Sequence, residues 1–358
     1  MKNFLLPLIL LAGISSAAQT DSTKNPFIIS GYAELYYSYD FNNPSDHNRP
    51  GFFYAYNRHN EFNLHLGYIK AAYSTDKTRA NLSLMSGTYS NANLSAEPGV
   101  LKNVFEANAG VKISKNKNIW VDAGIMPSHI GFESAIGKDC WNLTRSILAD
   151  NSPYYETGVK LGYTCSSEKL YLAGMLLNGW QHIQRINSNQ TISGGTQLTY
   201  KPSTKVILNW STFVGNEQPD TNKLMRYFNN FYGILQLTDK FGVTAGFDYG
   251  MQQRIKGGSD YNTWYSPVLI ARYAISDKVR IAARGEYYSD EKGAIIATGS
   301  ENGFQTMGYS LNLDILPVEN AMIRFEIRSL NSKDKIFVKD DKIVNDNTFA
   351  TASFAISF

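Results

Sequence analysis

The chain has 358 residues, of which 18% are charged and 13% aromatic, and its formal net charge is +3. So small a charge excludes nucleic-acid binding through bulk charge, and a mean hydropathy of −0.28 excludes a bundle of membrane helices. No uninterrupted apolar run of about 18 residues follows Ala18, so strands must make any membrane crossing.

The N-terminus has the pattern of an export signal. Lys2 supplies a positive start, residues 4–12 form a short apolar run, and residues 16–18 offer small side chains at a cleavage site. The apolar run is too short to cross a bilayer as a helix, and no cysteine follows it to accept a lipid. We predict that residues 1–18 are a cleaved signal peptide and that residues 19–358 are one outer-membrane β-barrel domain.

Beyond this signal, apolar and polar residues alternate along most segments. The pattern is clear in residues 27–39 and recurs in residues 103–114, 303–315 and 347–358. In the first of these segments the apolar set is Phe27, Ile29, Ala33, Leu35 and Tyr37, and the other set is Ser30, Tyr32, Glu34, Tyr36 and Ser38. A period of two is that of a strand whose two faces meet unlike surroundings.

Continued along the chain, this period predicts about sixteen strands. They are placed at residues 27–39, 60–73, 79–88, 103–114, 119–126, 155–164, 169–178, 193–200, 206–216, 227–237, 241–253, 264–274, 279–289, 303–315, 321–330 and 347–358. The second segment loses its clean alternation near Lys70, where a β-bulge is one interpretation.

The links between the predicted strands alternate in length. Short turns such as 115–118 and 276–278 take turns with long links such as 40–59, 127–154 and 331–346. Membrane barrels have short periplasmic turns and long extracellular loops, whereas a soluble jelly roll has no reason for this difference. The predicted fold is all-β, a closed antiparallel transmembrane β-barrel with both termini in the periplasm. A large soluble antiparallel protein is the alternative.

The C-terminal run sets Phe354, Ile356 and Phe358 on one face and ends on an aromatic residue. It resembles the terminal signal by which bacterial outer-membrane barrels are recognised for assembly. Four further stretches are Gly124-Ile125-Met126-Pro127-Ser128-His129-Ile130-Gly131-Phe132-Glu133, Ser152-Pro153-Tyr154-Tyr155, Asn178-Gly179-Trp180 and Arg284-Gly285-Glu286-Tyr287-Tyr288-Ser289-Asp290. On these residues the chain resembles the OmpL-like family of β-barrel porins over nearly its whole mature length. The resemblance implies an outer-membrane porin of a Gram-negative bacterium.

The width of such a barrel favours transport, because about eight strands leave room only for side chains while about sixteen leave an aqueous channel. We predict a water-filled pore for passive diffusion of small hydrophilic solutes or ions, with no enzymatic activity, cofactor or metal. His129 and Glu133 lack the second histidine of a helical zinc motif. A surface adhesin or binding protein on a barrel scaffold is one alternative. An outer-membrane hydrolase, whose Ser, His and acidic residues would meet only in space, is the other.

The expected partners follow from this location. They are outer-membrane lipid and lipopolysaccharide, the barrel-assembly machinery and small hydrophilic solutes. Nucleic acid is not expected to bind, and the sequence is compatible with a homo-oligomer. Tyr and Trp near strand ends are expected to form interfacial girdles. These residues are Tyr37, Tyr39, Trp120, Tyr155, Trp264, Tyr265, Tyr287 and Tyr288. Tyr32, Tyr36 and Tyr288 have inward parity, so they either fill the lumen or offer a platform on which sugars stack.

Cys140 and Cys165 are the only cysteines, too few for a disulfide scaffold. Cys140 falls in a long extracellular link and Cys165 in a short periplasmic turn. The strand between them has about ten residues at roughly 3.3 Å each, which exceeds the reach of a disulfide. We therefore predict no bridge, an argument that weakens if the long link dips deep into the lumen.

The longest link, residues 127–154, carries apolar residues that a solvated external loop has little reason to keep. We expect it to fold inward and to narrow the pore. The predicted pore-lining or constriction residues are Glu133, Asp139, Arg145 and Asp150 on the link, facing Arg272, Arg280, Arg284, Glu286, Arg324, Glu326 and Arg328 on the wall. Opposed charges across a narrow passage would create a transverse field that tunes ion preference. The alternative is a structural ladder of cross-strand ion pairs.

Overall fold

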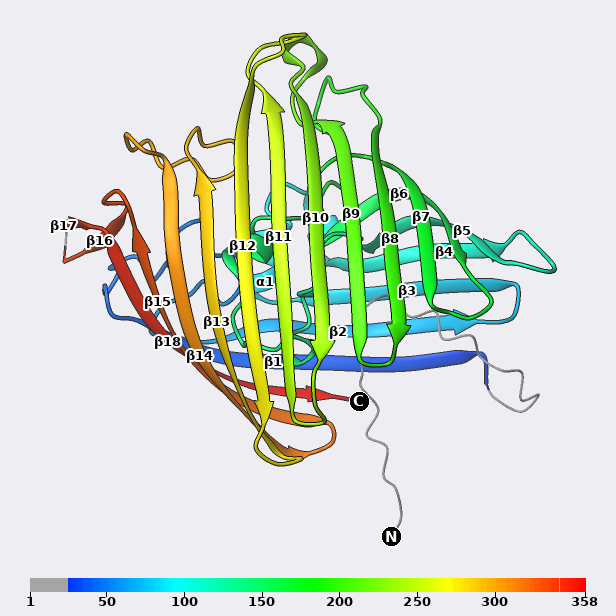
Figure 1. Ribbon diagram of the computed structural model, residues 1–358, viewed down its shortest axis with the longest axis horizontal. Coiled ribbons are helices and arrows are strands. Elements are labelled where there is room, and N and C mark those ends of the chain that lie inside the picture. Colours follow the sequence, from blue (N-terminus) through cyan, green and yellow to red (C-terminus); the bar gives the residue numbers. More distant parts are fainter. Residues whose placement is uncertain (1–24, 341) are drawn as a thin grey trace.

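Residues 25–340 and 342–358 are described by the computed structural model, in which the chain winds into a closed β-barrel (Figure 1). The predicted signal peptide, residues 1–18, lies outside the described residues. The barrel strands are β1 (Phe27–Asp40), β2 (Phe62–Ser74), β3 (Thr78–Ser86), β4 (Val104–Lys112), β5 (Asn118–Pro127), β6 (Tyr155–Thr164), β7 (Leu170–Leu177), β8 (Ser193–Ser203), β9 (Val206–Asn216), β10 (Met225–Gln236), β11 (Phe241–Gln253), β12 (Tyr261–Ala274), β13 (Val279–Asp290), β14 (Phe304–Val318), β15 (Ala321–Ser332) and β18 (Asp346–Ser357).

Each barrel strand pairs antiparallel with its neighbour in sequence, and β1 pairs with both β2 and β18 to close the barrel. These sixteen strands confirm the predicted fold class, and their bounds lie within a few residues of the predicted ones. In Figure 1 the strands β8 to β12 stand nearly upright in front, while β1 to β5 run across behind them. Front and back walls of a barrel cross in this way because its strands are inclined to the barrel axis.

The links contain short elements that the strand period does not reveal. The hairpin β16 (Phe337–Lys339) and β17 (Lys342–Val344) occupies the link predicted at 331–346. Helices α1 (Thr88–Asn93) and α2 (Ile147–Asp150) and the 3₁₀ turns η1 (Gly99–Asn103), η2 (Gly137–Asp139) and η3 (Asp220–Asn222) occupy others. Phe337 is fully buried, so the hairpin is fixed by packing over the barrel and not by its own short ladder.

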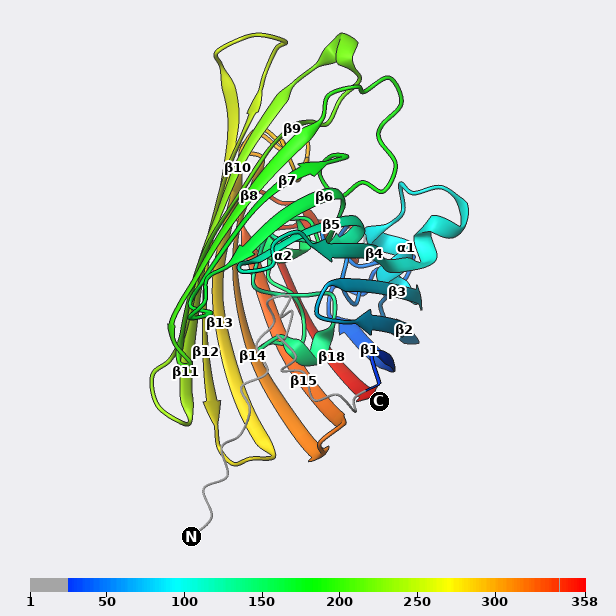
Figure 2. The ribbon, with the colours of Figure 1, turned by 90° about the vertical axis from the view of Figure 1, so that its right-hand side faces the viewer.

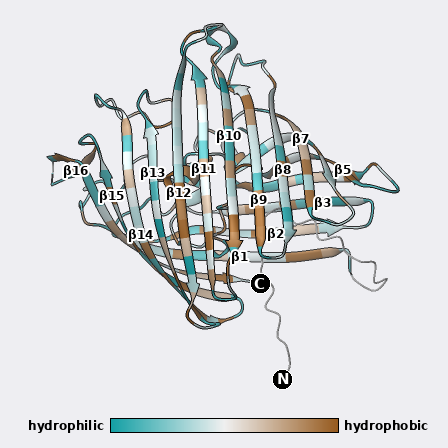
Figure 3. Cartoon of the chain, viewed as in Figure 1, coloured by the Kyte–Doolittle hydropathy of each residue, from teal (hydrophilic) through white to brown (hydrophobic). Residues whose placement is uncertain are grey.

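Alternation along the strands separates an inner from an outer face. On β14, Tyr309 and Leu311 are 60% and 64% exposed, whereas Ser310 and Asn312, which alternate with them, are buried. Exposed apolar residues along a whole wall mean that no second sheet covers it, which excludes the jelly-roll alternative. Figure 3 shows the same alternation as hydrophobic and hydrophilic bands along the strands.

Two expectations about the wall are wrong. The irregularity in β2 is not at Lys70, which pairs regularly with Ser30, but at His65, where the register with β1 shifts between Glu34 and Leu35. The extra residue of this bulge turns both His65 and Leu66 inward, and both are fully buried.

The second error concerns the aromatic girdle. Tyr155, Trp264 and Tyr288 are at most 5% exposed and face the interior, so they do not lie at a membrane interface. Tyr37, Tyr39, Tyr265 and Tyr287 have the opposite parity and do lie on the outer face. Because Tyr32, Tyr36 and Tyr288 are each 2% exposed, their rings fill the interior and present no open stacking platform.

The interior of the barrel is packed by side chains of the wall and of the links. Phe213, Phe228 and Trp264 from the wall form one apolar cluster with Phe53 and Ile130 from two links. Apolar side chains from the wall and from the links thus form a hydrophobic core inside the barrel. Among the described residues no helix is long and apolar enough to cross a membrane.

Candidate functional site: the lumen and its inserted loop

The link of residues 127–154, called the inserted loop, runs through the lumen from one rim of the barrel to the other. It leaves β5 at the rim that carries the long links, the long-loop rim, and returns there to β6. At its far point, Lys138 Nζ donates to Ser357 Oγ at 2.7 Å, beside the turn between β14 and β15 on the opposite, short-turn rim. Figure 2 shows α2, which belongs to this loop, inside the curved wall.

Apolar residues of the inserted loop pack on the wall, as their presence predicted. Ile130, Ile147 and Leu148 are at most 5% exposed. The ring of Phe132 lies 5.8 Å from that of Tyr232 on β10. Trp141 lies so close to Gly242 on β11 that a Cβ there would come within 2.8 Å of the indole. Another part of the loop reaches the opposite strands, because Ala135 packs in a cluster with Tyr32 and Leu66 and Lys138 N donates to the Tyr32 hydroxyl. The loop therefore crosses the lumen.

The loop begins at a buried histidine. His129 Nδ1 lies 2.6 Å from a carboxylate oxygen of Glu156 on β6, and Nε2 lies 2.8 Å from the backbone oxygen of Thr212 on β9. Both partners are acceptors, so the contacts are complete only when both ring nitrogens carry protons. Burial lowers the pKa of His129, but the Glu156 carboxylate and these hydrogen bonds outweigh it and raise the pKa above its ordinary value.

Three ion pairs on β13, β14 and β15 lie beneath the loop. They are Arg284–Glu326 at 2.9 Å, Arg328–Glu286 at 2.5 Å and Arg324–Asp314 at 2.7 Å. All six side chains are at most 4% exposed. Burying such charges costs free energy unless hydrogen-bond partners offset it, and the ion pairs of the wall are only part of those partners.

The backbone of the inserted loop supplies further partners, while Arg284 Nε, Glu286 Oε1 and Arg328 Nε and Nη2 make no hydrogen bond of good geometry to any residue that the structure describes. Arg284 and Arg324 each donate at 2.6 Å, to the backbone oxygens of Thr144 and Gly137. Glu326 accepts from Thr144 N at 2.6 Å. In the same way Arg328 donates to Arg145 O at 2.8 Å, and Glu286 accepts from Ile147 N at 2.7 Å. These contacts satisfy backbone groups of a loop that has little secondary structure of its own.

The acidic and basic residues of the loop itself bind partners that lie closer to them, most of them within the loop. Glu133 accepts from Ser146 N at 3.0 Å and lies 3.8 Å from Arg284. Arg145 donates to the backbone oxygens of Ser134, Leu143 and Ala135, so it braces the loop from inside. Asp150 accepts from Ala55 N at 3.3 Å and from the Tyr154 hydroxyl at 3.2 Å.

The remaining predicted residues stay outside this network. Asp139 is half-buried near the short-turn rim, and burial raises its pKa. Arg272 packs over the Trp141 ring at 4.2 Å. Arg280 is half-buried near the start of β13, and within the described ranges it has no ion pair. The structure thus joins Glu133, Arg284, Glu286, Arg324, Glu326 and Arg328 in the network that holds the loop and leaves Asp139, Arg272 and Arg280 outside that network.

A second set of charges, which sequence reasoning found only in part, lies on the opposite side of the lumen. Lys70 on β2 contacts Glu106 on β4 at 2.5 Å, and Arg79 on β3 contacts Asp122 on β5 at 2.6 Å. Lys160 on β6 pairs in register with Asp122. By the period of two, Glu106, Asp122 and Lys160 fall on the polar face of the strands predicted at 103–114, 119–126 and 155–164, but the bulge at His65 hides the inward orientation of Lys70.

Exposure distinguishes these two sides of the lumen. The side chains of Lys70 and Arg79 are 27% and 19% exposed, whereas those of Arg284, Arg324 and Arg328 are 0% exposed. Water therefore reaches the ion pairs of β2 to β5, and the inserted loop covers those of β13 to β15. Next to the exposed pairs, a buried apolar cluster that includes Leu66, Ile125 and Tyr155 fills part of the lumen.

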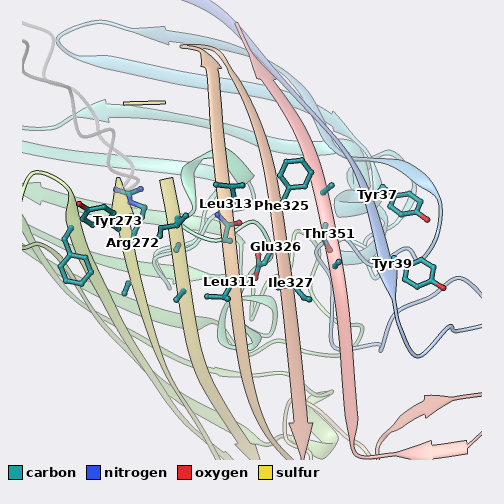
Figure 4. Close-up of a pocket in the computed structure, with 18 residues that line it drawn as sticks. Tyr37, Tyr39, Arg272, Tyr273, Leu311, Leu313, Phe325, Glu326, Ile327 and Thr351 are labelled. Carbon is teal, nitrogen blue, oxygen red and sulfur yellow. The ribbon is translucent and has the colours of Figure 1, made fainter. Parts of the chain in front are cut away.

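The outer face carries an apolar hollow of about 760 Å³ across β12 to β15, β18 and β1 (Figure 4). Leu311, Leu313, Phe325 and Ile327 line it, and the small residues of β18 leave space for it. Its lining is that of a wall in contact with hydrocarbon, so it is no part of the solute path. Across residues 25–340 and 342–358, no group of three or more His, Cys, Asp or Glu side chains is placed to hold a metal ion.

Comparison with known proteins agrees with this architecture. A family described as "Putative beta-barrel porin-2, OmpL-like" matches residues 26–358. Among curated proteins, none matches the chain.

Solved porin structures share the fold at low sequence identity. An anion-selective porin from Comamonas acidovorans is 10% identical, with a TM-score of 0.60 over 93% of this chain and 99% of that one. The outer-membrane channel DcaP of Acinetobacter baumannii is 10% identical, with a TM-score of 0.59 over 93% and 97%. A trimer form of OmpT of Vibrio cholerae is 10% identical, with a TM-score of 0.57 over 93% and 100%. The family match covers nearly the whole chain, which therefore belongs to the OmpL-like β-barrel porin-2 family and is a porin of the outer membrane.

Proposed function

We propose that this porin is a passive channel for small hydrophilic solutes or ions. The supporting observation is the side of the lumen along β2 to β6, where the ion pairs Lys70–Glu106 and Arg79–Asp122 face inward and keep contact with water. Ionisable groups on the lipid face near mid-bilayer cost about 2 to 4 kcal/mol for Arg or Lys, so such groups belong to a hydrated interior. By this proposal the short-turn rim is periplasmic and the long-loop rim extracellular.

The inserted loop then sets the width of the passage. The wall residues Arg284, Glu286, Arg324, Glu326 and Arg328 hold its backbone, and Glu133, Arg145 and Asp150 brace it from inside. Their proposed role in the constriction is to fix the loop. Asp139, Arg272 and Arg280, which are partly exposed near the short-turn rim, are the members of the predicted set that solutes would contact.

The proposed partners follow from the two faces of the wall. The apolar outer face contacts outer-membrane lipid and lipopolysaccharide, and the C-terminal strand is presented to the barrel-assembly machinery. The trimer form of the OmpT structure supports a homo-oligomer for this chain as well. Residues 1–18 would be removed on export, leaving the barrel of residues 19–358.

Reconstitution of the purified porin into planar bilayers tests the channel. Discrete conductance steps in KCl are expected, because a hydrated lumen carries ions. A barrel that serves only as an adhesin scaffold would insert without steps, and that outcome would refute the proposal.

A further inference from the structure

The charges on the hydrated side of the lumen do not cancel. Glu106 and Asp122 are the carboxylates of the set, and Lys70, Arg79 and Lys160 are its cations. Each carboxylate is already paired, Glu106 with Lys70 and Asp122 with Arg79. Three cations against two carboxylates leave one positive charge.

Lys160 carries this excess charge. Its register partner Asp122 accepts from both Arg79 Nε and Arg79 Nη2 at 2.6 Å, a bidentate pair that uses both carboxylate oxygens. The Trp120 ring, 4.2 Å from the Arg79 guanidinium, holds that pair in place. Within the described part of the chain, Lys160 has no ion pair and no side-chain hydrogen bond, and it remains partly exposed on the lumen face.

The opposite wall cannot balance this charge at close range. The acidic residues Glu286, Glu326 and Asp314 are buried in ion pairs beneath the inserted loop. Glu156, the further carboxylate that acts on Lys160 from the same strand, is paired with His129 at 2.6 Å. A paired carboxylate presents a dipole to a passing ion, whereas an unpaired ammonium presents a full charge. In a narrow passage with low-dielectric walls, that charge is focused along the water path.

We propose that Lys160 makes the passage selective for small anions, such as chloride and short organic carboxylates. The inference rests on the proposed channel function and names a residue that sets its ion preference. The ammonium attracts anions into the hydrated side of the lumen and repels cations from it. No stable complex is required, because a selective site in a channel must also release its ion.

Reversal potentials across a KCl gradient test this role in bilayers that contain the full-length porin. The unmodified channel should prefer chloride. Lys160→Gln should lower the chloride-to-potassium permeability ratio by roughly two- to fivefold, since one charge at about 4 Å in water is worth about fivefold. Lys160→Glu should reverse the preference, and Lys160→Arg should retain it. Lys278→Glu, in the exposed turn between β12 and β13, makes the same charge change away from the lumen and should alter the ratio little.

The outcomes separate this inference from the channel itself. Absence of conductance steps in the unmodified protein refutes the channel proposal. Normal steps with the same permeability ratio in Lys160→Gln as in the unmodified protein refute the role of Lys160 and leave the channel standing. Lys160→Gln is close in length to lysine, so its assembly, checked by heat-dependent gel mobility, is expected even where Lys160→Glu fails to fold.

Discussion

His129 on the inserted loop and Glu156 on β6 form a buried pair, with 2.6 Å between Nδ1 and a carboxylate oxygen. Both side chains are 2% exposed. The pair lies where the loop enters the lumen, and Ser211 on β9 adds a hydrogen bond of 2.7 Å to the backbone oxygen of His129. The protonation of one imidazole is thereby coupled to the docking of a loop of 28 residues, 127–154.

This coupling predicts that the inserted loop docks less strongly in the lumen at high pH. The docked loop raises the pKa of His129, so its contribution is complete below the ordinary histidine pKa of about 6.5 and is lost as pH rises through the docked value. Hydrogen exchange of residues 128–136, corrected for intrinsic rates, should show less protection at pH 9 than at pH 6. In His129→Gln the protection should be lower and should depend less on pH, with the Asp150 contribution remaining. Equal protection of the unmodified loop at both pH values would contradict the coupling.

Asp150 should act in the same direction. Burial raises the pKa of this carboxyl to about 7, against the opposing effect of Arg328 and Arg145. A raised carboxyl pKa favours docking below the ordinary aspartate value, and this preference is lost as pH rises through about 7. The amide side chain of the variant Asp150→Asn has nearly the same shape as aspartate and can still accept from Ala55 N and the Tyr154 hydroxyl, but it cannot ionise. Exchange protection of α2 should therefore fall between pH 5 and 8 in the unmodified protein and stay level in the variant; matching profiles would exclude a role for Asp150.

Arg324 is predicted to be the strongest single anchor of the inserted loop. Its guanidinium pairs with Asp314 and donates to three loop carbonyls, those of Gly137, Cys140 and Trp141. Arg324→Met leaves Asp314 buried without its partner, at a cost of about 3 to 5 kcal/mol. The middle of the loop should then be released, which would appear as noisier currents with higher mean conductance. Arg254→Met, at an exposed position in the link after β11, is the matched control and should leave the current unchanged.

Deletion of the loop's middle, residues 137–145, tests the constriction directly. This segment reaches the short-turn rim and fills the lumen beside β13 to β15. Its removal should raise single-channel conductance and alter ion selectivity in an otherwise intact barrel. If both quantities are unchanged, the loop does not define the narrowest part of the passage.

The strands were predictable from sequence because each wall residue faces either hydrocarbon or the lumen. Apolar and polar residues therefore alternate along each strand with a period of two. The insertion of residues 127–154 was predictable from residues such as Ile130 and Leu148, which need burial. The partners of the loop were not, because Arg284 and Glu326 meet Thr144 only through the closure of the barrel. The wall arginines form the cross-strand ion pairs of the alternative interpretation and also bind the loop, while the transverse field stays a prediction.

Local irregularities of the strands also limited what could be predicted from the sequence. The bulge at His65 shifts the parity of the rest of β2, so an alternation count placed the irregularity near Lys70 and missed that residue's contact with Glu106. Trp264 and Tyr288 near strand ends look like interfacial residues by type alone. Their neighbours in the apolar cluster, Phe228 and Phe304, show that these rings fill the lumen instead.

The two cysteines report on the docked loop. Both cysteines are free, as predicted from the sequence. The inserted loop nevertheless carries Cys140 into the lumen, where it is buried. Burial raises the pKa of the Cys140 thiol to about 11, while a hydrogen bond with Ser167 lowers the pKa of Cys165. A maleimide should therefore modify Cys165 and spare Cys140. Arg324→Met should make Cys140 reactive; rapid labelling of Cys140 in the unmodified protein would contradict a docked loop.

Phe358 should matter for assembly more than for the pore. Its backbone exchanges hydrogen bonds of 3.0 and 2.8 Å with Gly31, and its side chain is 71% exposed on the outer face. Gly31 has no side chain to displace the Phe358 ring, which lies where a Cβ would be. Phe358→Asp places a charge near the membrane interface, where its energetic cost is about 0 to 1 kcal/mol. A large loss of outer-membrane protein in this variant would thus arise from failed recognition of the C-terminal strand, while channels that do assemble should keep the unmodified conductance. Gly31→Val, which disturbs the same contact without changing the C-terminal residue, is the control: it should reduce assembly less than Phe358→Asp, and equal losses would point to the local contact and away from recognition.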